Sequence, residues 1–292
     1  MKEASTLLVM QTSNLALTHL ANEVVGSLLM NSQLFYQLPT WAIGLLFAFV
    51  LLSALEFGYY VGRGLQDSWK NANPTNGQII LTSMLALLGL IIAFTYGASV
   101  ERFDARKQAV VLEANAMRDA FLQADLVAEP GRTELKQVLL DYARTRMLKQ
   151  GEHRSQERFQ ELAQKSLQAL PKLWRVTKQI VGPNSSAHFQ LVNAVKQVLS
   201  THMIRLAAIE DELPISVILM LLLVAAASLS VAGFNAGISG RLNRWRMTIF
   251  ALVLVGVMLV ILDFDQPLDG FIRVNFNSIN SVINGMEANL AQ

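Results

Sequence analysis

Hydrophobic residues are concentrated in four long runs along this chain, and polar sequence separates the runs. The runs cover residues 41–62, 79–100, 214–240 and 247–263. A helix needs about 20 mostly apolar residues to cross the hydrocarbon core of a bilayer. We therefore predict four transmembrane helices, because the remaining sequence is too short to bury four such runs inside a soluble protein.

Residues 101–213, between the second and third runs, are polar and carry a helical pattern without strand-like alternation. We predict helices over 101–127, 133–150, 155–181 and 185–213, and we expect Pro171 to kink or divide the third of them. The first and last of these helices continue from spans two and three. The sequence thus predicts an all-α membrane protein whose extramembrane helical bundle is formed largely by extensions of those two spans.

Apolar residues recur at helical spacing within two of these helices, which is typical of faces buried against neighbouring helices. In the second helix the stripe consists of Leu135, Val138, Leu139 and Tyr142. In the fourth helix we assign the stripe to Phe189, Val192, Val195, Leu199, Met203, Leu206 and Ile209. These stripes favour the core of a helical bundle over a cofactor pocket.

Two flanking pieces complete the predicted organisation. Residues 1–38 form an N-terminal amphipathic segment with a mild stripe at Leu17, Leu20, Val24 and Leu28. Residues 264–292 form a C-terminal tail with a turn and a short amphipathic helix near Ile279, Val282, Ile283 and Met286. Between them lie a transmembrane hairpin over 39–100, the helical domain over 101–213 and a second hairpin over 214–263. The tail packs on the helical domain or lies on the membrane surface.

Composition supports a membrane protein and excludes several function classes. Hydrophobic residues make up 52% of the 292 residues, charged residues 16%, and the net charge of +2 is too mild to indicate a nucleic-acid partner. The chain has no cysteine, which excludes disulfides and thiolate metal sites. Its histidines are isolated in sequence, at His19, His153, His188 and His202. We predict no enzyme, no cofactor and no metal site.

Charged residues at the edges of the spans are the main candidates for function. Glu56 lies inside span one, Asp263 and Asp265 close span four, and Glu101, Arg102, Asp104 and Arg106 follow span two. Ionisable groups at membrane depth usually face a partner or a cavity. They either pair with one another at the interface, with Arg102, Arg106 and Arg273 neutralising Asp263 and Asp265, or line an ion path.

Small residues gather in the second half of span three. Gly233 and Gly237 form a GxxxG pair there. Such pairs let helix backbones approach closely in a membrane. The pair is a candidate for helix packing, either within one subunit or between subunits.

The short loops carry an excess of basic residues, namely Arg63, Lys70, Arg241, Arg244 and Arg246. Short loops rich in Lys and Arg tend to stay in the cytoplasm, whereas long domains are translocated whatever their charge. This pattern favours a bacterial inner-membrane protein with cytoplasmic short loops. The helical domain and both termini then lie on the opposite side.

Two stretches resemble the bestrophin-like family of bacterial membrane proteins. One is the run from Leu85 to Tyr96, continued by Glu101 to Lys107 and Glu113 to Ala116; the other runs from Ile261 to Val274. The resemblance implies kinship to bestrophins, which are pentameric ion channels with four spans and a cytoplasmic helical domain between spans two and three. It thus implies a homo-oligomer in a lipid bilayer that passes inorganic ions. The alternative is a non-conducting membrane scaffold or sensor whose helical domain binds a partner.

Overall fold

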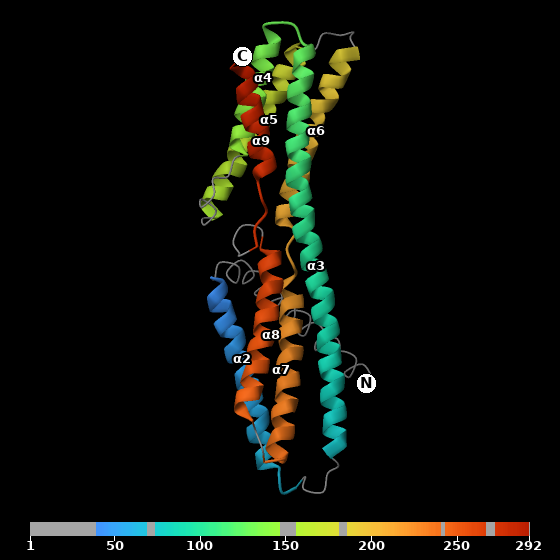
Figure 1. Ribbon diagram of the computed structural model, residues 1–292, viewed down its shortest axis with the longest axis vertical. Coiled ribbons are helices and arrows are strands. Elements are labelled where there is room, and N and C mark those ends of the chain that lie inside the picture. The colour runs from blue at the N-terminus through green and yellow to red at the C-terminus, as the bar shows by residue number, and fades with distance from the viewer. Residues whose placement is uncertain are drawn as a thin grey trace, which may run out of the picture. The chain divides into compact units, whose positions relative to one another are not determined.

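The computed structural model describes residues 39–68, 74–146, 156–180, 186–240, 243–266 and 272–291, and all of its regular elements are helices (Figure 1). In chain order they are α2 (Thr40–Gly64), α3 (Pro74–Gln123), η1 (Ala124–Leu126), α4 (Gly131–Thr145), α5 (Gln156–Ile180), α6 (Ser186–Glu210), α7 (Ile215–Ile238), α8 (Arg244–Asp265) and α9 (Asn277–Leu290). The predicted amphipathic segment over 1–38 lies outside the described residues.

Four stretches of helix are long and apolar enough to cross a membrane. They correspond to α2, the first part of α3, α7 and α8, with mean hydropathies of 2.0 to 2.6 in their most apolar windows. The prediction of an all-α chain with four spans is confirmed. Span two continues without a break into the polar part of α3, whereas residues 211–214 separate α6 from α7. Pro214, which has no N–H to donate, stands directly before α7.

The described residues divide into two compact units, one drawn from 39–95 and 213–260, the other from 96–212 and 261–291. In the first unit α2 lies against α7 (Figure 1). In the second unit, α3, α4, α5, α6 and α9 share one hydrophobic core. Its fully buried side chains include Met117, Leu135, Leu139, Leu173 and Leu191.

The position of helix α9 shows where the C-terminal tail lies. Ile279, Ile283 and Met286 belong to the core of the second unit and are at most 2% exposed. Arg144 of α4 donates from Nη2 to Oε1 of Glu287 at 2.8 Å. Of the two positions left open by the sequence, the tail takes the one on the helical domain.

Of the two outcomes expected at Pro171, division is not observed, because Pro171 lies inside an unbroken α5, and a kink stays a prediction. One other expectation about the helical domain is wrong in detail. The stripe assigned to α6 is displaced, because Phe189 is 67% exposed and Met203 is 56% exposed. The side chains that α6 buries are Leu191, Val195, Val198, Thr201, His202 and Arg205. The prediction used apolar residues alone and therefore missed this face, because its last three buried residues, Thr201, His202 and Arg205, are polar. The stripe predicted in α4 is confirmed.

Candidate functional site

Glu56 has a cationic partner at the start of α8. Its Oε1 accepts a hydrogen bond from Nε of Arg244 at 3.0 Å. The same guanidinium lies over the ring of Tyr59, 5.6 Å from its centroid, and Nη1 of Arg63 donates to the Tyr59 hydroxyl at 3.0 Å. The carboxylate inside the first apolar run is therefore paired with the first residue of α8, next to the short loop before it.

Glycines bring the backbones of α2 and α7 together. A Cβ built on Gly233 would come within 3.0 Å of the Leu55 carbonyl oxygen, and one on Gly237 would do the same at Tyr59. On α2, Gly58 and Gly62 meet the backbone of α7 in the same way. The GxxxG pair of span three therefore packs inside the subunit, against a second GxxxG pair whose role the sequence analysis had missed.

Arg106 joins three segments of the second unit at the ends of two helices. Its guanidinium donates to the carbonyl oxygens of Ala208 at 3.0 Å, Asp211 at 2.8 Å and Phe264 at 3.2 Å. The last carbonyls of a helix lack partners within the helix, and a cation near them also complements the helix dipole. Burial lowers the pKa of Arg106, and Asp265 foremost opposes that effect.

The other predicted edge charges lie in varied surroundings. Arg102 pairs with Asp211, with 3.3 Å between Nε and Oδ2. Asp263 accepts the backbone N–H of Ile272 at 2.9 Å, and Asp265 is fully buried. Exposed side chains in this set are Glu101, Asp104 and Arg273. Neutralisation of Asp263 and Asp265 by all three arginines stays a prediction.

A buried ionic network that the sequence analysis missed lies inside the helical domain. Its centre is Glu113 of α3, whose side chain is 0% exposed. Oε2 accepts from Nη1 of Arg205 at 2.5 Å, and Oε1 lies 2.9 Å from Nε of Arg146. Arg146 also donates to Oγ of Ser166 at 3.1 Å. The network therefore ties α3, α5 and α6 to the C-terminal end of α4.

Tyr142 and His202 are the remaining members of the network around Glu113. The Tyr142 hydroxyl donates to Oε1 of Glu113 at 2.8 Å and lies 3.1 Å from Nδ1 of His202. Because a phenol has a single hydrogen, its oxygen accepts from His202, which places a hydrogen on Nδ1. Burial, followed by the charge of Glu113, raises the pKa of Tyr142, so the phenol stays protonated.

The electrostatics of the network keep Glu113 ionised. Burial alone would raise the pKa of Glu113, but the hydrogen bond from His202 and the charges of Arg146 and Arg205 lower it well below its usual range. One carboxylate thus faces two guanidinium groups that are 6% and 3% exposed. This arrangement is suited to holding the helices of the domain together. Within the described part of the chain, no three His, Asp or Glu side chains converge as metal ligands do.

A signal for this network is present in the sequence. Glu113 follows Val110 by three residues and precedes Met117 by four, and both neighbours are buried. A charged residue at such a spacing falls on the buried face of its helix. The sequence thus indicates that Glu113 needs a partner, although it does not say which one.

Comparison with known proteins gives a consistent family and fold. The model of the bestrophin-like domain matches residues 44–279. No curated protein matches the chain. Two crystal structures of bacterial bestrophin homologue variants from Klebsiella pneumoniae share the fold. One has 12% identity and a TM-score of 0.55, covering 84% of this chain and 99% of the homologue. The other has 13% identity and a TM-score of 0.56, covering 83% and 97%.

Proposed function

Because this chain belongs to the bestrophin-like family, we propose that it forms a homo-oligomeric ion channel in the bacterial inner membrane. Several copies surround a common axis, and the first part of α3 contributes to the path of inorganic ions. A pentamer is the assembly that kinship with bestrophins implies.

The observation that carries this proposal is the low burial of span two. Of the most apolar 18-residue window in α3, 11% is buried, against 33% in α2, 33% in the helix containing α7 and 39% in α8. A transmembrane helix without protein around it meets lipid, other copies of the chain or water. Among the described spans, span two therefore leaves the largest share of its most apolar window unburied and available for assembly.

The exposed surface of span two includes a face of small residues. Ala86, Gly89 and Ala93 recur at spacings of three and four residues, and all three are exposed. Small residues let transmembrane helices approach one another closely, which suits several copies of α3 around one axis. Later along the same helix, Glu101 and Asp104 are also exposed. In a ring of copies these carboxylates would repeat around the axis, as in the charged rings that select ions.

Conduction is tested directly with purified protein in planar bilayers. We expect salt-dependent unitary currents, together with a particle that contains several copies of the chain in nanodiscs. A monomer or dimer without an axial path, and no current over a range of salts, voltages and tensions, would refute the channel. That outcome would favour a membrane scaffold or sensor.

The lack of cysteine in this chain allows the ion path to be mapped without background thiols. We expect the Ala93→Cys channel to be blocked by charged thiol reagents and to form disulfide-linked dimers under mild oxidation. The matched control is Phe49→Cys on α2, where the side chain is 70% exposed and apolar. If thiol reagents modified both variants equally and blocked the current equally in both, an ion path along α3 would be contradicted.

We propose that the short loops face the cytoplasm. Arg63 and Arg244 belong to this basic set, and positive short loops are retained in the cytoplasm. Reporter fusions at Asn73 and Gln150 test this orientation. A reporter at Gln150 that is active in the cytoplasm would reverse it, and would match the orientation of bestrophins.

A further inference from the structure

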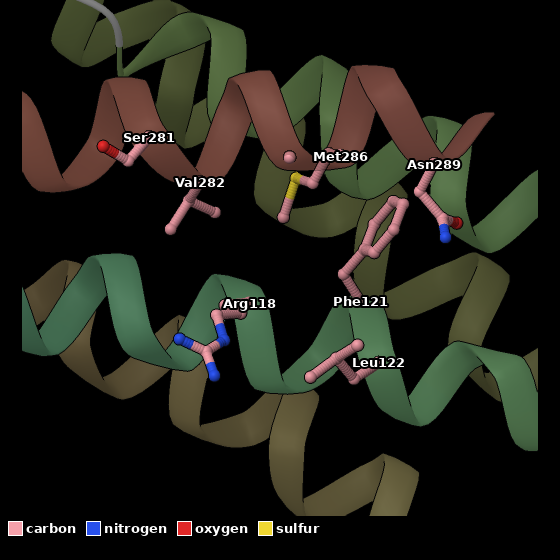
Figure 2. Close-up of a pocket in the computed structure, with 8 residues that line it drawn as sticks. Arg118, Phe121, Leu122, Ser281, Val282, Met286 and Asn289 are labelled. Carbon is pink, nitrogen blue, oxygen red and sulfur yellow. The ribbon is translucent and has the colours of Figure 1, made fainter. Parts of the chain in front are cut away.

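A groove of about 300 Å³ lies between α3 and α9 on the helical domain (Figure 2). It is lined by Arg118, Phe121, Leu122, Ser281, Val282, Gly285, Met286 and Asn289. Figure 2 shows Arg118 near one end of the groove, facing Val282 and Ser281, and Asn289 at the other end beyond Phe121 and Met286. The groove belongs entirely to the second unit and is distinct from the buried Glu113 network.

The middle of the groove is apolar. Phe121 and Met286 form its floor and are 5% and 2% exposed, respectively. Leu122 forms part of its wall and remains 53% exposed. A ligand that covers this wall would remove apolar surface from water, which favours binding.

The charged and polar groups of the groove favour an anion. Arg118 is exposed, and its guanidinium has no ion pair or hydrogen bond with any described residue. Asn289 uses its Oδ1 to accept from Nζ of Lys136 at 2.7 Å, which leaves its amide NH₂ as a donor. Lys136 is itself held by an ion pair with Asp125. None of the described residues that line the groove is acidic.

Gly285 keeps the groove open in the middle of α9. A Cβ added there would meet nothing within 4 Å. Glycine inside a helix is destabilising relative to alanine, so neither helix propensity nor packing within the described chain explains this residue. A larger side chain at this position would occupy the space between α9 and α3.

We propose that this groove binds a small amphipathic anion, namely a short-chain acyl carboxylate. The carboxylate pairs with Arg118, and the acyl chain lies over Phe121 and Met286 towards Asn289. The volume equals about ten water molecules at roughly 30 Å³ each, which fits a ligand of about ten non-hydrogen atoms, the size of octanoate. This site goes beyond the proposed channel and does not depend on conduction.

The test is equilibrium dialysis of radiolabelled octanoate against the full-length protein in nanodiscs of zwitterionic lipid, with empty nanodiscs as the background. We expect saturable binding with one site per chain. Octanol and acetate, which lack the charge and the acyl chain respectively, should compete at least tenfold more weakly. Saturable binding that acetate displaces as well as octanoate would show an adventitious anion site and overturn the proposal.

Two exposed substitutions test the site by different physical means. Arg118→Gln removes the charge and Gly285→Leu fills the groove, and each should weaken octanoate binding about tenfold or more, since a charge-assisted bond is among the stronger hydrogen bonds. The matched control is Arg175→Gln, another exposed arginine, which lies on α5 and does not line the groove, and it should leave the affinity unchanged. Thermal unfolding shows whether each variant is folded.

Two further outcomes would overturn the proposal. Unchanged octanoate affinity in a folded Arg118→Gln protein would exclude the carboxylate site. A change in the number of copies per particle in Arg118→Gln or Gly285→Leu, without a change in octanoate binding, would assign the groove to an interface between copies. Conductance measured in parallel separates either result from failure of the channel proposal.

Discussion

Replacing Glu113 with glutamine removes the carboxylate at the centre of the buried network while preserving the shape of the side chain. In the native protein, Glu113 faces Arg146 and Arg205, whose side chains are 6% and 3% exposed. In Glu113→Gln, both guanidinium groups stay buried without a counter-charge among the described residues of the network. The Tyr142 hydroxyl also loses a charged acceptor.

The size of the effect follows from burial. Breaking a buried ion pair by removing one partner destabilises a protein by about 3–5 kcal/mol, because the remaining charge is uncompensated. In a domain of 150–250 residues, 1 kcal/mol shifts Tm by roughly 2–4 °C. We therefore expect Glu113→Gln to lower the Tm of the helical domain by roughly 6–20 °C.

The assay is thermal unfolding in nanodiscs, followed by far-ultraviolet circular dichroism. The matched control is Glu287→Gln, which removes a carboxylate from the ion pair with Arg144 in the same unit. Those two side chains are 44% and 50% exposed, and exposed ion pairs contribute about 0–1 kcal/mol. We expect this control to lower Tm by less than about 4 °C.

Equal Tm shifts in Glu113→Gln and Glu287→Gln would refute the reasoning, because burial would then have no effect on the ion pairs. A second variant tests the charge balance itself. Adding Arg205→Met to Glu113→Gln removes one of the two unpaired cations and should recover part of the lost stability. A further loss of similar size would show that packing of Arg205, rather than its charge, dominates.

Three further outcomes are expected from thermal unfolding. Gly58→Ala should destabilise the first unit by about 1–3 kcal/mol, because the added Cβ would clash with the backbone of α7. Its control is Gly256→Ala, which should be neutral or mildly stabilising because a Cβ there has no atom within 4 Å. Arg106→Lys should lower the free energy of unfolding by about 1–3 kcal/mol, because the compact ammonium group cannot replace the guanidinium bonds to three separate carbonyls. The control Arg118→Lys should leave the free energy of unfolding unchanged. The Tm difference between native protein and Glu113→Gln should be full at neutral pH and shrink below about pH 4. Folding lowers the pKa of Glu113, so the stability that this carboxylate contributes is lost as acid protonates it. A difference that stays constant from pH 7 to pH 3 would contradict this assignment.

Hydrophobicity along the chain determined the spans. Span four was predicted over 247–263, and α8 covers Arg244–Asp265. The stripe at Leu135, Val138, Leu139 and Tyr142 also located the buried face of α4. These features depend on neighbours within a few turns of one helix. The family resemblance, which rests on short local motifs, was recognisable for the same reason.

Tertiary structure decided which residues became partners. Glu113 pairs with Arg205, 92 residues further along the chain, and Arg106 reaches the carbonyl of Phe264 across 158 residues. The sequence singled out Gly233 and Gly237, but only the packing of α2 on α7 showed that Gly58 and Gly62 face them. Helix periodicity states which side of a helix is buried, whereas the identity of the opposing atoms depends on how distant helices pack. That is why apolar runs are readable from sequence and ionic networks are not.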